Sequence, residues 1–100
     1  MDFRFKDKKL ERLYTEEAGA RFYPPAVVKR FFELMAVIDA APDEREFYRL
    51  KSLHFEKLKG KRENLFSMRL NKQYRLILTL ETDNEGRYVL VIEISDHYKK

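Results

Sequence analysis

The C-terminal third of the chain contains three runs in which apolar and polar residues alternate, and this pattern restricts the possible folds more than any other feature. The runs cover residues 65–70, 74–82 and 87–95, and the connectors between them hold only three or four residues. Alternation with a period of two is typical of strands with one buried face, and connectors this short join antiparallel neighbours. The sequence therefore predicts an antiparallel meander, which a fourth strand over residues 53–58 extends across the loop 59–64.

The first half of the chain supplies helices that can cover one face of this sheet. Phe3 and Phe5 alternate with polar residues and indicate a short first strand, after which Asp7 can cap a short helix. A second helix is predicted from Pro24, because proline is tolerated in the first helical turn. Its apolar residues recur at helical spacing and form one stripe: Val27, Val28, Phe31, Leu34, Met35 and Ile38.

A short third helix is predicted over residues 44–50, because Asp43 and Glu46 have the spacing of a capping box. The expected fold class is α+β, with two or three helices packed on one face of a curved, mainly antiparallel sheet. A chain of 100 residues with 44% hydrophobic side chains can build one core, so we expect a single domain over residues 1–100.

Composition excludes several classes of protein. The chain has no cysteine and only two histidines, so we expect no disulfide, no metal site and no cofactor. No apolar run reaches the roughly 18 residues of a membrane span, and the first residues are too polar for a secretory signal. These features predict a cytoplasmic protein without membrane association.

Basic residues cluster in the middle of the chain. Between Lys51 and Arg75 there are eight lysines and arginines but only two glutamates. Such a cluster indicates either a polyanionic or an acidic protein partner, or simply a solvated face.

The strand register places two of these cations together. Each of the two runs has an alternating apolar set that must face the helices: Phe66, Met68 and Leu70 in the first, and Tyr74, Leu76 and Leu78 in the second. A three-residue turn, or an equivalent bulge, achieves this by pairing Arg69 with Arg75. Like charges directly opposite each other in a sheet are destabilising by up to about 1 kcal/mol. Either the arginine stems cover apolar sheet surface, or the pair binds phosphate, which the guanidinium fork does in bidentate fashion.

The last strand is expected to direct its even-numbered residues to the core: Tyr88, Leu90, Ile92 and Ile94. The other face then carries Val89, Val91, Glu93, Ser95 and, if the strand continues, His97. A histidine beside Asp96, Tyr98 and two arginines has neighbours that can tune a general acid or base near neutral pH.

A family resemblance rests on residues 5–14, on the helix end at 34–41, on two denser motifs and on the end of the chain. The two motifs are LKGKR at residues 58–62 and FSMRLNKQYRL at 66–76, and the end is VIEISDHY at 91–98. In their order and spacing, the chain resembles the HigB branch of the RelE/ParE toxin superfamily over nearly its whole length.

The resemblance implies a ribosome-dependent endoribonuclease that cuts messenger RNA without a metal ion. It also implies a HigA-like helix-turn-helix antitoxin that holds the enzyme inactive. The toxin would contact DNA only indirectly, through this antitoxin. Cleavage by the 2′-hydroxyl needs a base, an acid and cations for the charge that grows on the phosphate.

The resemblance also suggests residue roles. Arg69 and Arg75 would bind the phosphate, and Lys59 and Arg62 would complete the clamp. Proton transfer would fall to His97 and Tyr98 with Asp96 orienting one of them, and Lys57 and Lys61 would contact the RNA backbone.

Two departures from the family pattern leave alternatives open. The usual ending Asp-Tyr-His is here Asp96-His97-Tyr98, and Glu56 occupies a position where the family often has a histidine, so Glu56 is a candidate base. The chain's own His54 lies two residues earlier and is interpreted as a structural or surface residue. The alternatives are a non-catalytic ParE-like inhibitor of a protein target and a degenerate toxin that retains only antitoxin binding.

Overall fold

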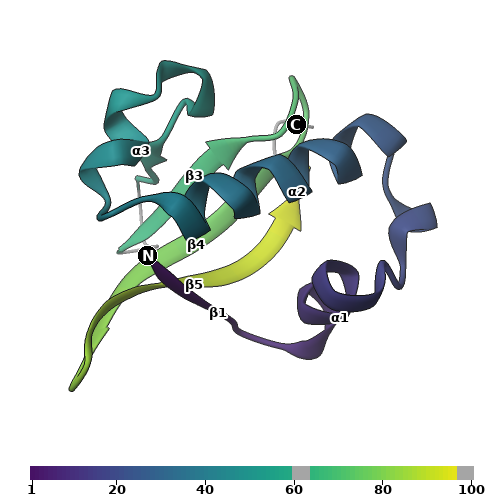
Figure 1. Ribbon diagram of the computed structural model, residues 1–100. Coiled ribbons are helices and arrows are strands. Elements are labelled where there is room, and N and C mark those ends of the chain that lie inside the picture. Colours follow the sequence, from purple (N-terminus) through teal and green to yellow (C-terminus); the bar gives the residue numbers. More distant parts are fainter. Residues whose placement is uncertain (60–63, 97–100) are drawn as a thin grey trace.

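The computed structural model describes residues 1–59 and 64–96, and it contains a five-stranded sheet in the order β1-β5-β4-β3-β2 (Figure 1). The strands are β1 (Asp2–Phe5), β2 (Glu56–Lys57), β3 (Leu65–Arg69), β4 (Arg75–Asp83) and β5 (Gly86–Ser95). The helices are α1 (Lys8–Glu16), α2 (Pro25–Ala40) and α3 (Arg45–Arg49), with 3₁₀ turns η1 (Ala20–Phe22) and η2 (Lys51–Leu53). β1 runs parallel to β5 and the other pairs are antiparallel, which confirms the α+β fold class.

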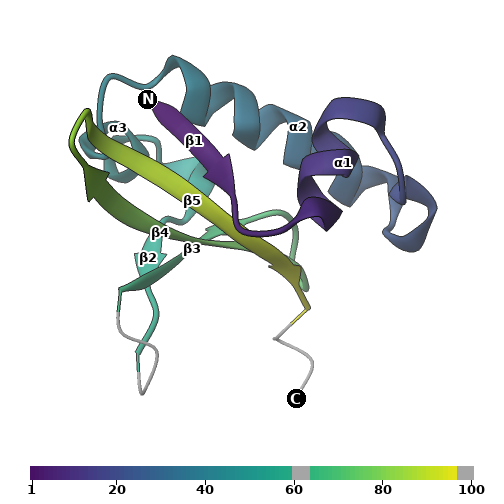
Figure 2. The same cartoon turned by 90° about the horizontal axis from the view of Figure 1, so that it is seen from below.

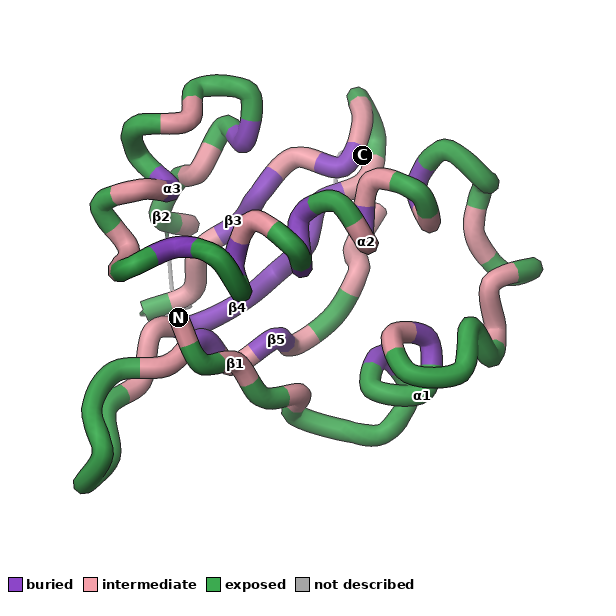
Figure 3. Tube along the Cα trace, viewed as in Figure 1, coloured by how far each residue is buried: buried purple, intermediate pink, exposed green. Residues whose placement is uncertain are grey.

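The helices lie on one side of the sheet, as Figure 2 shows for α1 and α2. Asp7 caps α1 by accepting a hydrogen bond from the Lys9 N–H, and Pro25 opens α2. The predicted stripe of α2 is fully buried except for Val28, which is half-buried. It packs on the core residues of the sheet, which lie on the central strands (Figure 3): Met68, Leu76, Leu78, Val89 and Val91. No helix in the described part of the chain is long and apolar enough to cross a membrane.

The register between β3 and β4 is the one predicted, with Arg69 directly opposite Arg75. The three-residue turn that produces it is held by Asn71, whose side-chain oxygen accepts hydrogen bonds from the Gln73 and Tyr74 N–H groups. This side-chain bridge adds to the backbone hydrogen bonds that the Leu70 and Asn71 N–H groups donate to the Tyr74 carbonyl oxygen at 3.0 and 3.2 Å.

The predicted phase of the last strand is wrong in its first half. Val89 and Val91 are completely buried beneath the helices, whereas Leu90 pairs with Thr79 on the other face. A β-bulge explains the difference: Ile77 pairs with Glu93 but Leu78 pairs with Val91, so Ile92 is one extra residue. Beyond the bulge the predicted phase holds, and Ser95 lies opposite Arg75.

The strand predicted over residues 53–58 is reduced to the two residues of β2. Leu53 ends η2 and is buried in the core, and His54 then adopts a left-handed conformation with φ 47°. This reversal lets Phe55 stack on Phe66 with ring centroids 5.1 Å apart. The chain therefore enters the sheet only at Glu56.

Candidate functional site

Arg75 is the centre of a polar cluster on the sheet face that is turned away from the helices. Its side chain is only 4% exposed. Nε and Nη2 donate to the Ser67 hydroxyl oxygen at 3.1 and 2.8 Å, and Nη2 also donates to the His54 carbonyl oxygen at 2.8 Å. These bonds fix the plane of the guanidinium group.

The local chain path explains why these groups meet. Ser67 and Arg69 are two residues apart on β3, so both point to the face that carries Arg75 on β4. Glu56 pairs with Ser67 across β2 and β3 and therefore shares that face. The left-handed conformation of His54 brings this residue over the two arginines from the edge of the sheet.

Two further groups complete the site. The Glu56 carboxylate is 3.5 Å from Nη2 of Arg75, and its side chain is 55% exposed. Arg69 is half-buried, and its Nη1 lies 3.4 Å from Nε2 of His54. The site thus combines an accessible guanidinium group, a fixed buried one, an imidazole and a carboxylate. Such a set can bind an anion and exchange a proton beside it.

The Arg75 side chain is buried, whereas both arginines were expected to be exposed on the uncovered face of the sheet. The expected pairing with Arg69 is present, but Ser67 and His54 already bind the Arg75 guanidinium group. A buried charge needs such partners, because an unsatisfied guanidinium group would be costly inside the protein. Arg69 is therefore the more accessible of the two cations.

The other candidate residues lie at the margins of this cluster or beyond it. Asp96 directly follows Ser95, the residue that pairs with Arg75. Lys57 pairs with Phe66 and so lies on the opposite sheet face from Glu56, while Lys59 is exposed just beyond β2. Four candidates lie outside the described residues: Lys61, Arg62, His97 and Tyr98.

Sequence reasoning did not identify Ser67 as part of the site and undervalued His54. The alternation of β3 does contain the signal for Ser67, since it lies two residues before Arg69 on the same face. The role of His54 depends on its left-handed turn, which no residue pattern in this segment indicates. Among the described residues, no group of three or more histidines, aspartates and glutamates is placed to hold a metal ion.

Comparison with known proteins agrees with this architecture. Residues 3–94 match a family model described as the RelE-like toxin of type II toxin-antitoxin system HigB. The chain is 36% identical over 77 residues to Toxin HigB-1 of Vibrio cholerae, covering 77% of this chain and 81% of that protein.

Two solved structures share the fold. One is the archaeal RelE-RelB complex from Pyrococcus horikoshii, with 18% identity, 99% of this chain and 97% of that chain covered, and a TM-score of 0.59. The other is the YoeB-YefM complex from Staphylococcus aureus, with 22% identity, 98% of each chain covered and a TM-score of 0.58. On the family match and the 36% identity, the chain belongs to the HigB family of RelE-like toxins of type II toxin–antitoxin systems.

Proposed function

We propose that the protein is an endoribonuclease that cuts messenger RNA on the ribosome and that a HigA-like antitoxin holds it inactive. The observation that carries the proposal is the grouping of Arg69, Arg75, His54 and Glu56 on the face away from the helices. This set supplies the cations and the proton acceptor that phosphodiester cleavage needs.

The reaction begins with the ribose 2′-hydroxyl at the cleaved bond. Its proton passes to the Glu56 carboxylate, which is sufficiently exposed to meet a substrate. The 2′-oxygen then forms a bond to phosphorus, and negative charge grows on the non-bridging phosphate oxygens. Arg69 neutralises this charge from the sheet face, because a guanidinium group forms strong bonds to phosphate.

The second half of the reaction breaks the bond between phosphorus and the 5′-oxygen. The leaving oxygen takes a proton from His97 or Tyr98, which yields a 2′,3′-cyclic phosphate and a 5′-hydroxyl. Asp96 orients the proton donor, and no step needs a metal ion. Lys59, Lys61 and Arg62 contact the RNA backbone, and Lys57, which lies on the other sheet face, is left out of this contact.

Arg75 acts as a positioning residue in this proposal. It connects β4 to β3 through the Ser67 hydroxyl and to the segment before β2 through the His54 carbonyl. It therefore fixes the backbone that carries His54 and Glu56 beside Arg69.

A purified translation system programmed with a defined message tests the proposal. Primer extension should map cuts that depend on ribosomes, and Arg69→Ala and Glu56→Gln should each lower the cleavage rate by about 10²-fold or more. Arg49→Ala is the matched control, because Arg49 is an exposed arginine on α3 whose ion pair with Glu46 is a surface pair of small energetic weight. Growth arrest with intact transcripts would instead favour a non-catalytic toxin.

A further inference from the structure

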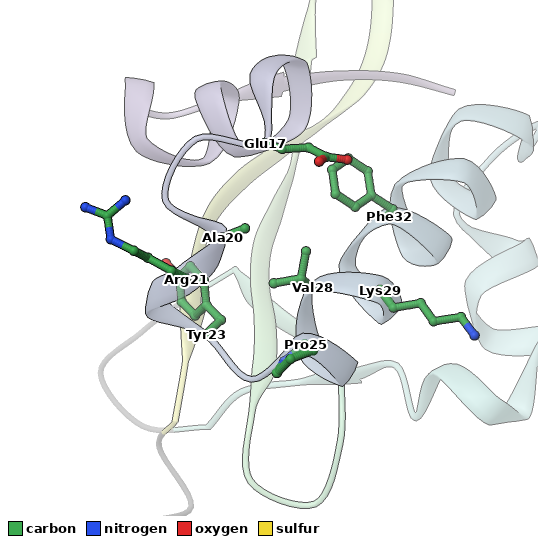
Figure 4. A pocket seen from close by; sticks show the side chains of 8 residues that line it. All are labelled: Glu17, Ala20, Arg21, Tyr23, Pro25, Val28, Lys29 and Phe32. Carbon is green, nitrogen blue, oxygen red and sulfur yellow. The ribbon is translucent and has the colours of Figure 1, made fainter.

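The helical side of the molecule contains an open apolar hollow between η1 and α2. Its volume is about 530 Å³. Ala20, Val28 and Phe32 form its floor and are half-buried against the core. Figure 4 shows these side chains facing the space, with Arg21 extending from one side of it and Lys29 from the other. The hollow is thus an apolar trough with a cation on each flank.

A second hollow lies beside the same 3₁₀ turn, formed with α1. Its volume is about 400 Å³, and its lining includes Lys8, Lys9, Arg12 and Phe22. Phe22 is 67% exposed, the most exposed large apolar side chain among the described residues. Both hollows are bordered by residues of η1, and we call their combined lining the η1 surface.

The charges of the η1 surface are one-sided. Five cations line the two hollows, namely Lys8, Lys9, Arg12, Arg21 and Lys29, against the single carboxylate of Glu17. Within residues 1–59 and 64–96 none of these cations forms an ion pair. Other arginines of the protein do have acidic partners: Arg4, Arg30, Arg45, Arg49 and Arg87. The η1 surface therefore offers unpaired positive charge beside exposed apolar area.

This combination fits an amphipathic peptide better than a nucleic acid. An apolar floor is covered by apolar side chains, and cations on the flanks attract carboxylates, which a helix presents on either side of its apolar stripe. Val28 and Ala20 offer no ring for base stacking, and Phe32 already stacks on Tyr14 at 6.1 Å with 24° between the rings. The other two aromatic rings of the surface each have a cation over one face, with Lys9 at 5.8 Å from Tyr23 and Arg21 at 4.8 Å from Phe22. Large exposed apolar patches with a polar rim mark protein interaction sites.

We propose that the η1 surface is the docking site for an acidic amphipathic helix of the antitoxin. The inference rests on the proposed function only for the identity of the partner, and it deepens that function by assigning a surface to antitoxin binding. The site lies on the helical side, whereas Arg69, Glu56 and His54 lie on or beside the opposite sheet face. Docking at the η1 surface therefore leaves the candidate catalytic residues uncovered by this segment.

The test measures binding of the antitoxin from the same locus to the purified toxin by calorimetry. The double variant Arg21→Glu/Lys29→Glu should weaken the Kd by roughly tenfold or more, since like charges then face each other across the interface. Phe22→Ala should weaken the Kd several-fold through lost apolar contact. These three side chains are exposed, so thermal melting should show that the variants remain folded. Lys51→Glu, an exposed lysine on η2 that forms no ion pair in the described residues, is the matched control and should leave the Kd within about twofold.

The outcomes separate the two proposals. Unchanged affinity in both the charge-reversal and Phe22→Ala variants would overturn the docking proposal. It would also be overturned if the charge reversal impaired ribosome binding while antitoxin affinity stayed constant, since the surface would then be an RNA contact. A third outcome is that the variants bind the antitoxin more weakly, as expected, while the unaltered toxin does not cut RNA. The docking proposal would then stand and the nuclease proposal would fall.

Discussion

Removing the Arg75 side chain should damage stability and activity together, whereas removing Arg69 should damage activity alone. Arg75 donates to Ser67 through two nitrogens and to the His54 carbonyl, all at 2.8–3.1 Å. Hydrogen bonds from a charged group contribute about 1.5–3 kcal/mol each and are not additive, so we expect Arg75→Ala to cost about 3 kcal/mol. Arg69 is half-buried, and within the described part of the chain its side chain has one polar contact, to His54 at 3.4 Å, so Arg69→Ala should cost less than about 1 kcal/mol.

Thermal and urea unfolding of the two variants measure this difference. For a domain of this size, 1 kcal/mol corresponds to roughly 4–8 °C in Tm, so Arg75→Ala should melt roughly 12–24 °C lower than the unaltered protein. Ser67→Ala should give an intermediate loss, because it removes the acceptor of two of the Arg75 hydrogen bonds. Equal melting temperatures for Arg75→Ala and Arg69→Ala would refute the conclusion that Arg75 holds the site together.

Three further outcomes are expected. Hydrogen bonds from Arg45 hold the pKa of the Asp43 carboxyl at about 2, below its ordinary value of 3.8. The ionised Asp43 therefore stabilises the fold fully above about pH 4, and this stabilisation is lost as the pH falls towards 2. Acid unfolding of Asp43→Asn should show a smaller loss over that range. Gly86→Ala should lower the Tm, because Gly86 has φ 122° in the β4–β5 turn and an alanine there is strained by about 1–3 kcal/mol. No atom lies within 4 Å of an added Cβ, so we expect no steric cost beyond this strain. A message with a 2′-deoxynucleotide at the mapped cut should resist cleavage there, and fragments cut elsewhere should carry 2′,3′-cyclic phosphate ends; cleavage of the deoxy site would contradict attack by the 2′-hydroxyl.

The arginine pairing was predictable because two neighbouring strands constrain each other. Each strand has an alternating apolar set on one face, and a three-residue turn lets both sets meet the same helices, although the buried Ile77 lies on the other face beside Arg75. The turn that the structure shows, closed by Asn71, has this length. The helix boundaries were predictable for a similar reason, since Asp7 and Pro25 act within the first turn of their own helices.

The phase of β5 was not predictable from its residues. Positions 88–92 are Tyr, Val, Leu, Val and Ile, so both faces of this segment are apolar and alternation cannot distinguish them. Only the packing of Val89 and Val91 under α2 and the extra residue at Ile92 settle which face is inside. The burial of Arg75 was equally hidden, because it depends on His54 returning over the sheet from a distant part of the chain.

The extra residue at Ile92 makes the spacing along the end of β5 as important as its chemistry. Side chains alternate along a regular strand, so without a bulge the phase that buries Val89 and Val91 would also turn Ser95 towards the helices and bring Ile94 to the side of the arginines. The bulge takes up one residue and reverses the phase of the strand end, which is why Ser95 lies opposite Arg75. The bulge therefore controls which residues arrive beside Arg75, independently of what those residues are.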